Sequence, residues 1–373
     1  MGDSKINLKD LKEDSKGKKK YFNFSIEIKY LILTLFILVL FILSSEAFGL
    51  VNFVKNNLLQ QEEICGDGTL YNSCSDIKPY FCSGGKLIDL ASVCGCPNNF
   101  VKRNDSCVSV YQTNPEELSL NYTLRGEDYS VNFSVYGDFE DYISKVPRSI
   151  YYSVEDNSSR ADFKLKAINE EEQKKLLLSL VIEIENITNN KEDQMRIAIS
   201  IVQNIPFGAS NKTTTFGNYI INYSRYPYEV LYDMQGICGE KTDLLVFLLR
   251  EIGYGTAFFY YPLGNHEAVG VKCPIKRSLL KSGYCFVETT GPSIITDNKI
   301  SYVGVGRLYE TPEIYSISDG ISLKNNLYEY SDATKLIKIR NLIEKNGWLG
   351  PVRERTFEKL KEKYGLVDEY YPG

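Results

Sequence analysis

The alternation of apolar and polar residues in the middle of the chain predicts both strands and helices. Apolar side chains alternate with polar ones over 118–124 and again over 129–135, with a turn at 125–128, which is typical of a β-hairpin. Apolar spacing of helical type predicts a helix over 170–185 and a second one after Asn190, whose side chain can cap it.

A third amphipathic stretch, from 238 to 252, predicts a helix that Gly253 ends. Three strands are predicted after it, at 256–261, 266–272 and 284–289. One helix followed by strands with short connections predicts a helix packed on an antiparallel meander, and therefore an α+β core. Further on, two helices are predicted at 333–345 and 354–363, on either side of the only tryptophan, Trp348.

The first part of the chain has the pattern of a membrane anchor. Residues 1–29 contain eight lysines and five acids, and 30–45 then contain no charge. Apolar residues after Glu46 extend the stretch to position 54, long enough to cross a bilayer as a helix, and the lysines before it favour a cytoplasmic N-terminus. We therefore expect a single-pass protein of the cell membrane whose C-terminal part is extracytoplasmic. A cleaved signal peptide is the alternative, because the apolar core at 31–43 also has signal-peptide length.

Six of the nine cysteines fall within 43 residues that contain little else to build a core. An even number of cysteines in so short an exported segment predicts three disulfides, with the pairing open. A zinc site is the weaker alternative, because no Cys-x-x-Cys pair is repeated. The six residues are Cys65, Cys74, Cys82, Cys94, Cys96 and Cys107. The segment that contains them resembles a small disulfide module of exported prokaryotic proteins, and the resemblance implies a stalk or partner-binding cap.

Two further cysteines, Cys273 and Cys285, flank a loop between predicted strands, and we expect them to form a disulfide that leaves Cys238 as the free thiol. A regular ladder in which His266 faces Glu288 would put Cys273 opposite Lys281. In that register the bridge requires the loop to double back.

The charge of the chain argues against nucleic acid as a partner. The chain has a formal net charge of −5, which becomes −8 once the +3 of residues 1–29 is subtracted, and no basic stripe follows the N-terminus. Nucleic acid is therefore not expected as a partner. Candidate sites of N-glycosylation begin at Asn104, Asn121, Asn132, Asn157, Asn186, Asn211 and Asn222.

The candidate chemistry lies between 225 and 292. Cys238 stands at the start of a predicted helix, where unpaired amides and the helix dipole stabilise a thiolate. His266 is the only histidine in the chain and hence the only candidate for an imidazole base. Glu288, on a neighbouring predicted strand, can accept a ring N–H and orient the imidazole; Thr289 is a weaker candidate for that role.

These residues lie in segments that resemble the transglutaminase-like superfamily over about 190–300. The resemblance implies a papain-like α+β fold and a Cys-His-Asp triad, which falls on Cys238, His266 and Glu288 in the same chain order. The chain departs from the pattern by having Glu288 where aspartate is usual and Val269 where an aromatic residue often follows the histidine. The matching segments are Gly236-Ile237-Cys238-Gly239, Leu249-Arg250-Glu251-Ile252-Gly253-Tyr254, Asn265-His266-Glu267-Ala268-Val269 and Phe286-Val287-Glu288-Thr289-Thr290.

The same resemblance suggests Gln203, 35 residues before Cys238, as a donor to the oxyanion. The alternative is that Gln203 only ties down the end of its helix before Pro206. Members of the superfamily include acyl-transferring cross-linkers, peptidases and amidases, so the resemblance indicates a reaction class and leaves the substrate open.

We therefore expect an anchored, extracytoplasmic thiol enzyme that attacks a peptide or carboxamide carbonyl, with hydrolysis favoured over transfer to an amine. A protein or peptide substrate is expected, and no metal or organic cofactor is implied. The alternative is a surface adhesion or assembly module that keeps the fold without turnover. The expected divisions are a basic tail at 1–29, an anchor at 30–54, a Cys-rich module at 63–110, an extension at 115–189, the catalytic core at 190–300 and a helical extension at 301–373.

Overall fold

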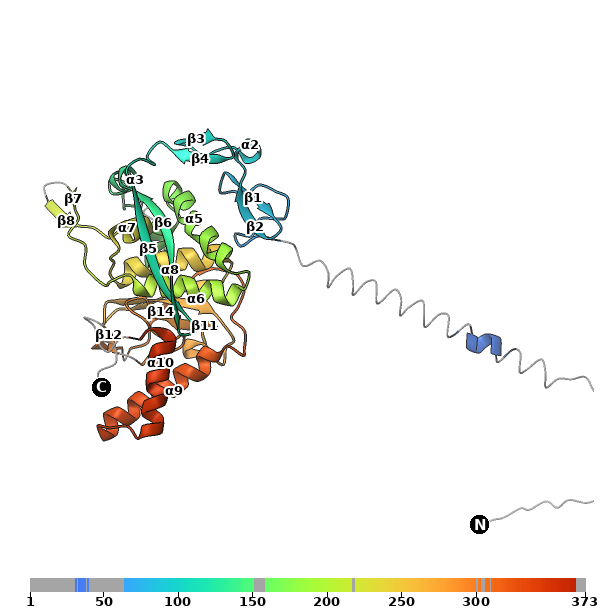
Figure 1. The fold of residues 1–373 in the computed structure, drawn as a ribbon, viewed down its shortest axis with the longest axis vertical. Helices are drawn as coiled ribbons and strands as arrows, with labels where there is room; N and C mark the ends of the chain where they lie inside the picture. Colours follow the sequence, from blue (N-terminus) through green and yellow to red (C-terminus); the bar gives the residue numbers. More distant parts are fainter. Residues whose placement is uncertain are drawn as a thin grey trace, which may run out of the picture. The chain divides into compact units, whose positions relative to one another are not determined.

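The computed structural model describes residues 31, 33–37, 39, 64–150, 158–216, 219–299, 301–302, 306–308 and 310–366 (Figure 1). The chain divides into two compact units, Met1–Glu62 and Glu63–Gly373. In the first unit the few described positions are helical. Among the described residues, no helix combines the length and the apolar character that crossing a bilayer requires. The anchor expected at 30–54 lies outside the described residues, apart from positions between 31 and 39.

The second unit is built around a four-stranded antiparallel sheet, so the predicted α+β class is confirmed. Its strand order is β11-β10-β9-β14, and neighbouring strands run in opposite directions. The edge strand β14 was not predicted and pairs with β9 through Phe258 and Tyr315. The strands are β9 (Thr256–Tyr261), β10 (His266–Lys272), β11 (Tyr284–Val287) and β14 (Glu313–Ser318).

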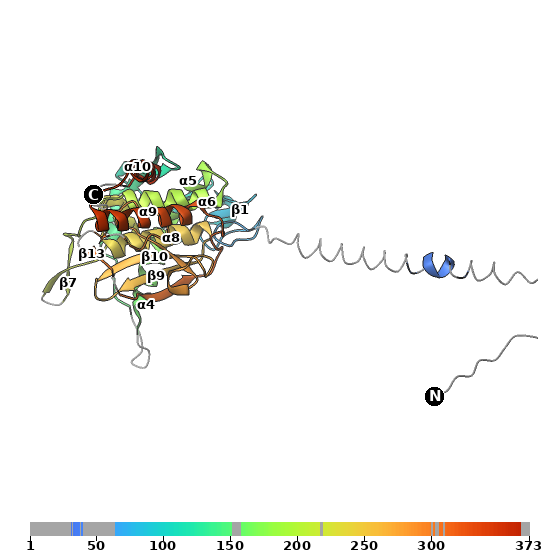
Figure 2. The same cartoon turned by 90° about the horizontal axis from the view of Figure 1, so that it is seen from below.

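Helix α8 (Cys238–Ile252) lies between this sheet and two other helices, α5 (Glu171–Ile187) and α6 (Lys191–Asn204) (Figure 2). Twelve of its fifteen residues are buried, which explains why its polar first turn is enclosed as well as its apolar face. The helix ends at Gly253, whose φ of 110° is strained for any residue with a side chain. Packing on both sides fixes the N-terminus of α8, where Cys238 stands.

The long hairpin β5 (Pro115–Leu124) and β6 (Glu127–Tyr136) packs along α6 and confirms the predicted alternation (Figure 1). Its turn is shorter than expected, because Arg125 and Gly126 both adopt positive φ and the second strand starts at once. The predicted cap of α6 is also confirmed, since the Asn190 side chain accepts from the amides of Glu192 and Asp193.

The remaining elements extend this framework. The two predicted C-terminal helices are present, although the first begins five residues earlier than expected. These two helices are α9 (Tyr328–Asn346) and α10 (Pro351–Tyr364). Three short helices were not predicted: α3 (Gly137–Ile143), α4 (Arg160–Ile168) and α7 (Pro227–Asp233). This part of the chain also contains a 3-10 turn, Leu279–Lys281. Two small hairpins are formed by β7 (Thr213–Phe216) with β8 (Tyr219–Asn222) and by β12 (Ser301–Tyr302) with β13 (Gly306–Arg307).

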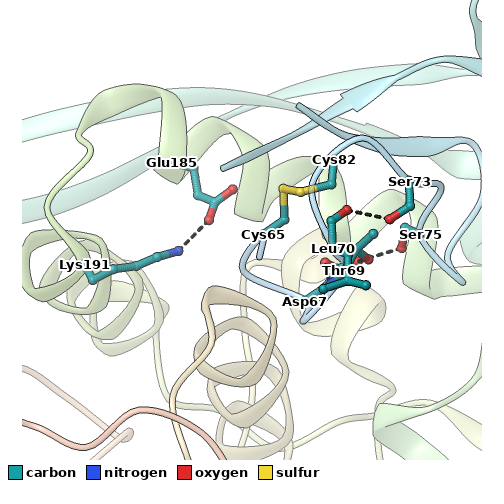
Figure 3. Close-up of a disulfide and its surroundings, with 9 residues drawn as sticks. All are labelled: Cys65, Asp67, Thr69, Leu70, Ser73, Ser75, Cys82, Glu185 and Lys191. Atoms are coloured by element: carbon teal, nitrogen blue, oxygen red, sulfur yellow. Dashed lines mark hydrogen bonds and ion pairs between the residues drawn. A yellow bond between two sulfur atoms is a disulfide. The ribbon is translucent and has the colours of Figure 1, made fainter. Parts of the chain in front are cut away.

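The Cys-rich module has the three disulfides that were predicted, with the pairing Cys65–Cys82, Cys74–Cys94 and Cys96–Cys107. Figure 3 shows the first of them beside the ion pair of Glu185 and Lys191, which links α5 to α6 at 2.9 Å. The elements of the Cys-rich module are β1 (Tyr80–Ser83), β2 (Lys86–Asp89), α2 (Ala91–Cys94), β3 (Phe100–Arg103) and β4 (Ser106–Ser109).

The module packs directly against the core. The buried Tyr80 side chain donates a 3.3 Å hydrogen bond to the Lys175 carbonyl on α5. At the end of α8, a Cβ on Gly66 would stand 2.7 Å from the Glu251 carbonyl oxygen, so only glycine fits at this contact.

The fourth predicted disulfide, between Cys273 and Cys285, is present, but the register expected for it is wrong. Val271 faces Cys285 in the ladder, two residues away from the predicted alignment. Cys273 is therefore a diagonal neighbour of Cys285 on the same face, and the two Cα atoms are 5.7 Å apart without any doubling back of the loop.

Candidate active site

Cys238 is the one cysteine outside a disulfide, and all nine cysteines lie in the described part of the chain. It is the first residue of α8 and is half-buried. The turn before it is fixed by Glu240, which accepts from the amides of Ile237 at 3.0 Å and Arg225 at 2.8 Å. Arg225 also forms a 3.1 Å ion pair with Glu240, so this buried carboxylate is neutralised. The thiol is thereby held at a defined helix N-terminus.

His266 is the first residue of β10 and is fully buried. Its Nε2 atom lies 2.9 Å from Oε2 of Glu288. Burial alone lowers the pKa of His266, but the Glu288 carboxylate and the hydrogen-bonded side chain of Cys238 outweigh burial and raise the pKa to about 10. Because Nε2 is committed to Glu288, Nδ1 is the ring nitrogen that remains for the sulfur.

Glu288 is also fully buried and follows directly after β11. Its second oxygen, Oε1, accepts three hydrogen bonds: from the Thr289 amide at 3.0 Å, the Thr290 amide at 2.9 Å and the Thr290 hydroxyl at 2.8 Å. Burial raises the pKa of Glu288, yet His266 and these donors hold it below the usual value. The carboxylate is therefore ionised and fixed in place, as a residue that orients an imidazole must be.

The three predicted triad residues come together from the N-terminus of α8, the start of β10 and the end of β11. Thr289, the weaker candidate for orienting His266, has another position: its hydroxyl shares a 3.1 Å hydrogen bond with Thr242 and lies 3.4 Å from the Cys238 carbonyl oxygen. Thr289 thus joins the carboxylate loop to the first turn of α8.

The side chain of Gln203 is held by the loop after Glu288. Its side-chain amide donates to the Glu288 carbonyl at 2.9 Å and to the Ser293 hydroxyl at 3.1 Å, and its oxygen accepts from the Ser293 amide at 3.3 Å. Of the two roles expected for Gln203, these contacts match the structural one, since they tie the end of α6 to the loop after Glu288.

Lys241 is a buried basic residue that no sequence pattern indicated. Its Nζ atom donates to the carbonyl oxygens of Gln203, Ile205 and Thr290 and so connects α8, the end of α6 and the loop after Glu288. Burial lowers the pKa of Lys241 to about 7, against an opposing effect of Glu288. No sequence signal separates Lys241 from the other charged residues of the first turns of α8, Glu240 and Asp243.

Cys238 lines a cleft of about 1030 Å³. The walls come from α4, from residues 144–149 and from the segment between β8 and α7, with Asn265 and Glu267 at one side of the thiol. No group of histidine, cysteine or acidic side chains in the described ranges is arranged to hold a metal ion.

A second charged cluster lies beside the thiol. Lys164 on α4 pairs with Asp243 at 3.1 Å and with Glu267, and it donates to the Gly239 carbonyl at 3.2 Å; Arg160 completes the pairing of Glu267. Burial raises the pKa of Asp243 to about 7, although Lys164 opposes this. A Cβ on Gly239 would lie 2.8 Å from Glu267 Oε2, so glycine after the nucleophile allows the cluster to come close.

Comparison of the chain with protein-family models, with curated proteins and with solved structures finds no match.

Proposed function

We propose that this protein is a thiol enzyme that attacks the carbonyl of a peptide or carboxamide through Cys238. One observation carries the proposal: a free half-buried thiol at a helix N-terminus interacts with a buried imidazole whose far nitrogen is held at 2.9 Å by a buried carboxylate. Each of these groups alone is common in protein interiors, whereas their combination beside a cleft is what nucleophilic catalysis requires.

Before the reaction His266 already holds the proton of the Cys238 thiol, as its raised pKa favours, and in the first half the thiolate sulfur forms a bond to the substrate carbonyl carbon. The negative charge on the carbonyl oxygen faces the first-turn amides of α8, which have no partner within the helix. His266 then gives its proton to the leaving nitrogen as the C–N bond breaks, so that an amine or ammonia departs and a thioester remains.

In the second half, water attacks the thioester carbonyl while His266 removes its proton. The C–S bond breaks, the acid leaves, and the proton returns to the sulfur. Glu288 keeps the imidazole in the tautomer that both halves need. Water is favoured over an amine as the acceptor because the acidic groups beside the thiol, Asp243 and Glu267, are already occupied by Lys164 and Arg160.

The proposal includes membership of the transglutaminase-like superfamily and a papain-like core. It is supported by the order Cys238, His266, Glu288 and by a nucleophile helix packed on an antiparallel sheet. Glutamate in the third position is compatible with the role, since its longer side chain reaches Nε2 at hydrogen-bonding distance.

We further propose an extracytoplasmic location with an N-terminal membrane anchor and a protein or peptide substrate. Four disulfides support an oxidising compartment, and the uncharged stretch at 30–45 supports the anchor.

Alkylation by iodoacetamide without reductant tests the enzyme proposal, because all other cysteines are in disulfides. We expect the full chain to incorporate one label, on Cys238, at pH 6 to 7 about tenfold or more faster than a free thiol such as N-acetylcysteine. His266→Ala should remove most of this advantage and Glu288→Gln part of it; Cys238→Ser is the blank. Ordinary reactivity that neither substitution changes would exclude the enzyme and leave a surface adhesion or assembly module.

A further inference from the structure

Of the charged side chains that line the cleft, all except the exposed Lys145 are paired with each other or with neighbours. Arg148 forms a 2.6 Å ion pair with Glu229, and Lys166 a 2.8 Å pair with Glu170. Arg225 is paired with Glu240, and Lys164 is paired with Asp243 and Glu267. Apart from a group that reaches Lys145, a charged substrate group entering the cleft would have to compete with these pairs.

Beside serines and Asn265, the lining offers a ligand a set of apolar side chains. Phe163 on α4 leaves 46% of its surface exposed although it lines the cleft. The lining also includes Val146, Pro147, Ala167 and Ile237, none of which is fully buried. Ile237 directly precedes the nucleophile, so one apolar residue of the lining adjoins Cys238.

From these contacts we infer that the cleft contains an apolar subsite for a bulky aliphatic or aromatic side chain of the acyl substrate, with Phe163 as the main determinant of specificity. The inference rests on the proposed function. Burying the exposed half of Phe163 against such a side chain removes apolar surface from water, which corresponds to an affinity gain of about tenfold.

The test compares three thiol-directed probes on the full chain: 2-chloroacetamide, N-(2-phenylethyl)chloroacetamide and N-chloroacetylglycine. In each case the sulfur displaces chloride and forms a thioether. Each rate is divided by the rate of the same probe with N-acetylcysteine, so that only the contribution of the protein remains. We expect the phenylethyl probe to show saturation and a corrected rate about tenfold above the other two.

Phe163→Ala should reduce that preference several-fold and Phe163→Leu should retain most of it, which separates loss of contact from loss of the fold. Trp348→Ala is the matched control, because Trp348 is an exposed aromatic residue (68%) that does not line the cleft. Fast labelling without a preference for the phenylethyl probe, or with a preference for the carboxylate probe, would contradict the apolar subsite but agree with the enzyme proposal.

Slow labelling that still prefers the phenylethyl probe would agree with the subsite and contradict the enzyme proposal. Slow labelling without any preference would contradict both.

Discussion

In the Cys-rich module many apolar side chains face solvent, whereas α8 in the core buries twelve of its fifteen residues. Val93, Val101 and Val110 are each more than half exposed. The module is held instead by three disulfides within 43 residues. In the core, apolar burial is sufficient to enclose ionised groups such as Glu288.

The difference shows where chemistry can be placed. Enclosing a carboxylate and an imidazole costs solvation free energy, which only a region with a large apolar core can offset. A cross-linked module lacks such a core and can present its surface to partners or serve as a spacer. Substitutions in the two regions should therefore differ in how far their effect spreads.

The largest effect is expected from Glu288→Ala, which leaves the buried His266 without its counter-charge. We expect the free energy of unfolding of the full chain to fall by about 3 to 5 kcal/mol, as urea denaturation would measure. Glu288→Gln keeps the shape and part of the hydrogen bonding and should cost clearly less. Equal losses in the two variants would mean that packing, and not charge, is what Glu288 supplies.

Removing one disulfide from the module should have a comparable cost in free energy but only a local effect. For Cys65→Ser/Cys82→Ser, whose cysteines are 17 residues apart, we expect a loss of about 3 kcal/mol confined to the module. Trypsin should then cleave near Lys78 and Lys86 first, while alkylation of Cys238 keeps its rate.

Leu248→Ala, in the middle of α8, provides the contrast. We expect this substitution to lower the free energy of unfolding by about 2 to 5 kcal/mol and the second unit to unfold cooperatively. Simultaneous cleavage of module and core in the disulfide variant would contradict the comparison.

The core also shows which parts of the fold the sequence specifies locally. The bounds of β9 and β10 agree with prediction, because Gly255, Pro262 and Asn265 interrupt the apolar runs at each end. The cap by Asn190 and the hairpin of β5 and β6 are equally local signals. The triad residues could be proposed because the chain has a single histidine.

What the sequence did not predict depends on contacts between distant segments. The loop between β10 and β11 has positive φ at Leu280 and Lys281, and no local pattern predicts either this loop or the register of the two strands. Lys164 and Glu267 are far apart along the chain and meet only because α4 packs on α8. The contacts of Gln203 with Ser293 are similarly long-range, so spacing alone could not separate its two expected roles.

Two buried bases in the core should have opposite effects on stability between pH 7.5 and 9.5. The pKa of His266 is raised to about 10, so folded protein holds a proton that unfolded protein has lost, and its stabilising contribution decreases as pH rises toward 10. The pKa of Lys241 is lowered to about 7, so folded protein lacks a proton that unfolded protein holds, and stability from this group rises with pH over the same range.

The two slopes should nearly cancel in the parent protein, and substitution should reveal each one. With Cys238 retained, because it contributes to the raised pKa of His266, we expect the stability of Lys241→Met to fall with pH and that of His266→Ala to rise, each by about 1 kcal/mol per pH unit. Urea denaturation at several pH values measures the slopes. Slopes of the same sign in the two variants would show that one of the pKa directions is wrong.

The smallest effect is expected from the pair of hydroxyl groups that joins the carboxylate loop to α8. Thr289→Val keeps the shape but removes the hydrogen bonds to Thr242 and to the Cys238 carbonyl oxygen. We expect a loss of about 1 kcal/mol in unfolding free energy and a few-fold slower alkylation of Cys238, because the sulfur is then held less firmly against the imidazole. Thr242→Val should give a similar result. Since the two threonines share one hydrogen bond, the double variant should cost less than the two single losses added together. Strict additivity would show that the threonines act separately and that their bridge does not position the thiol.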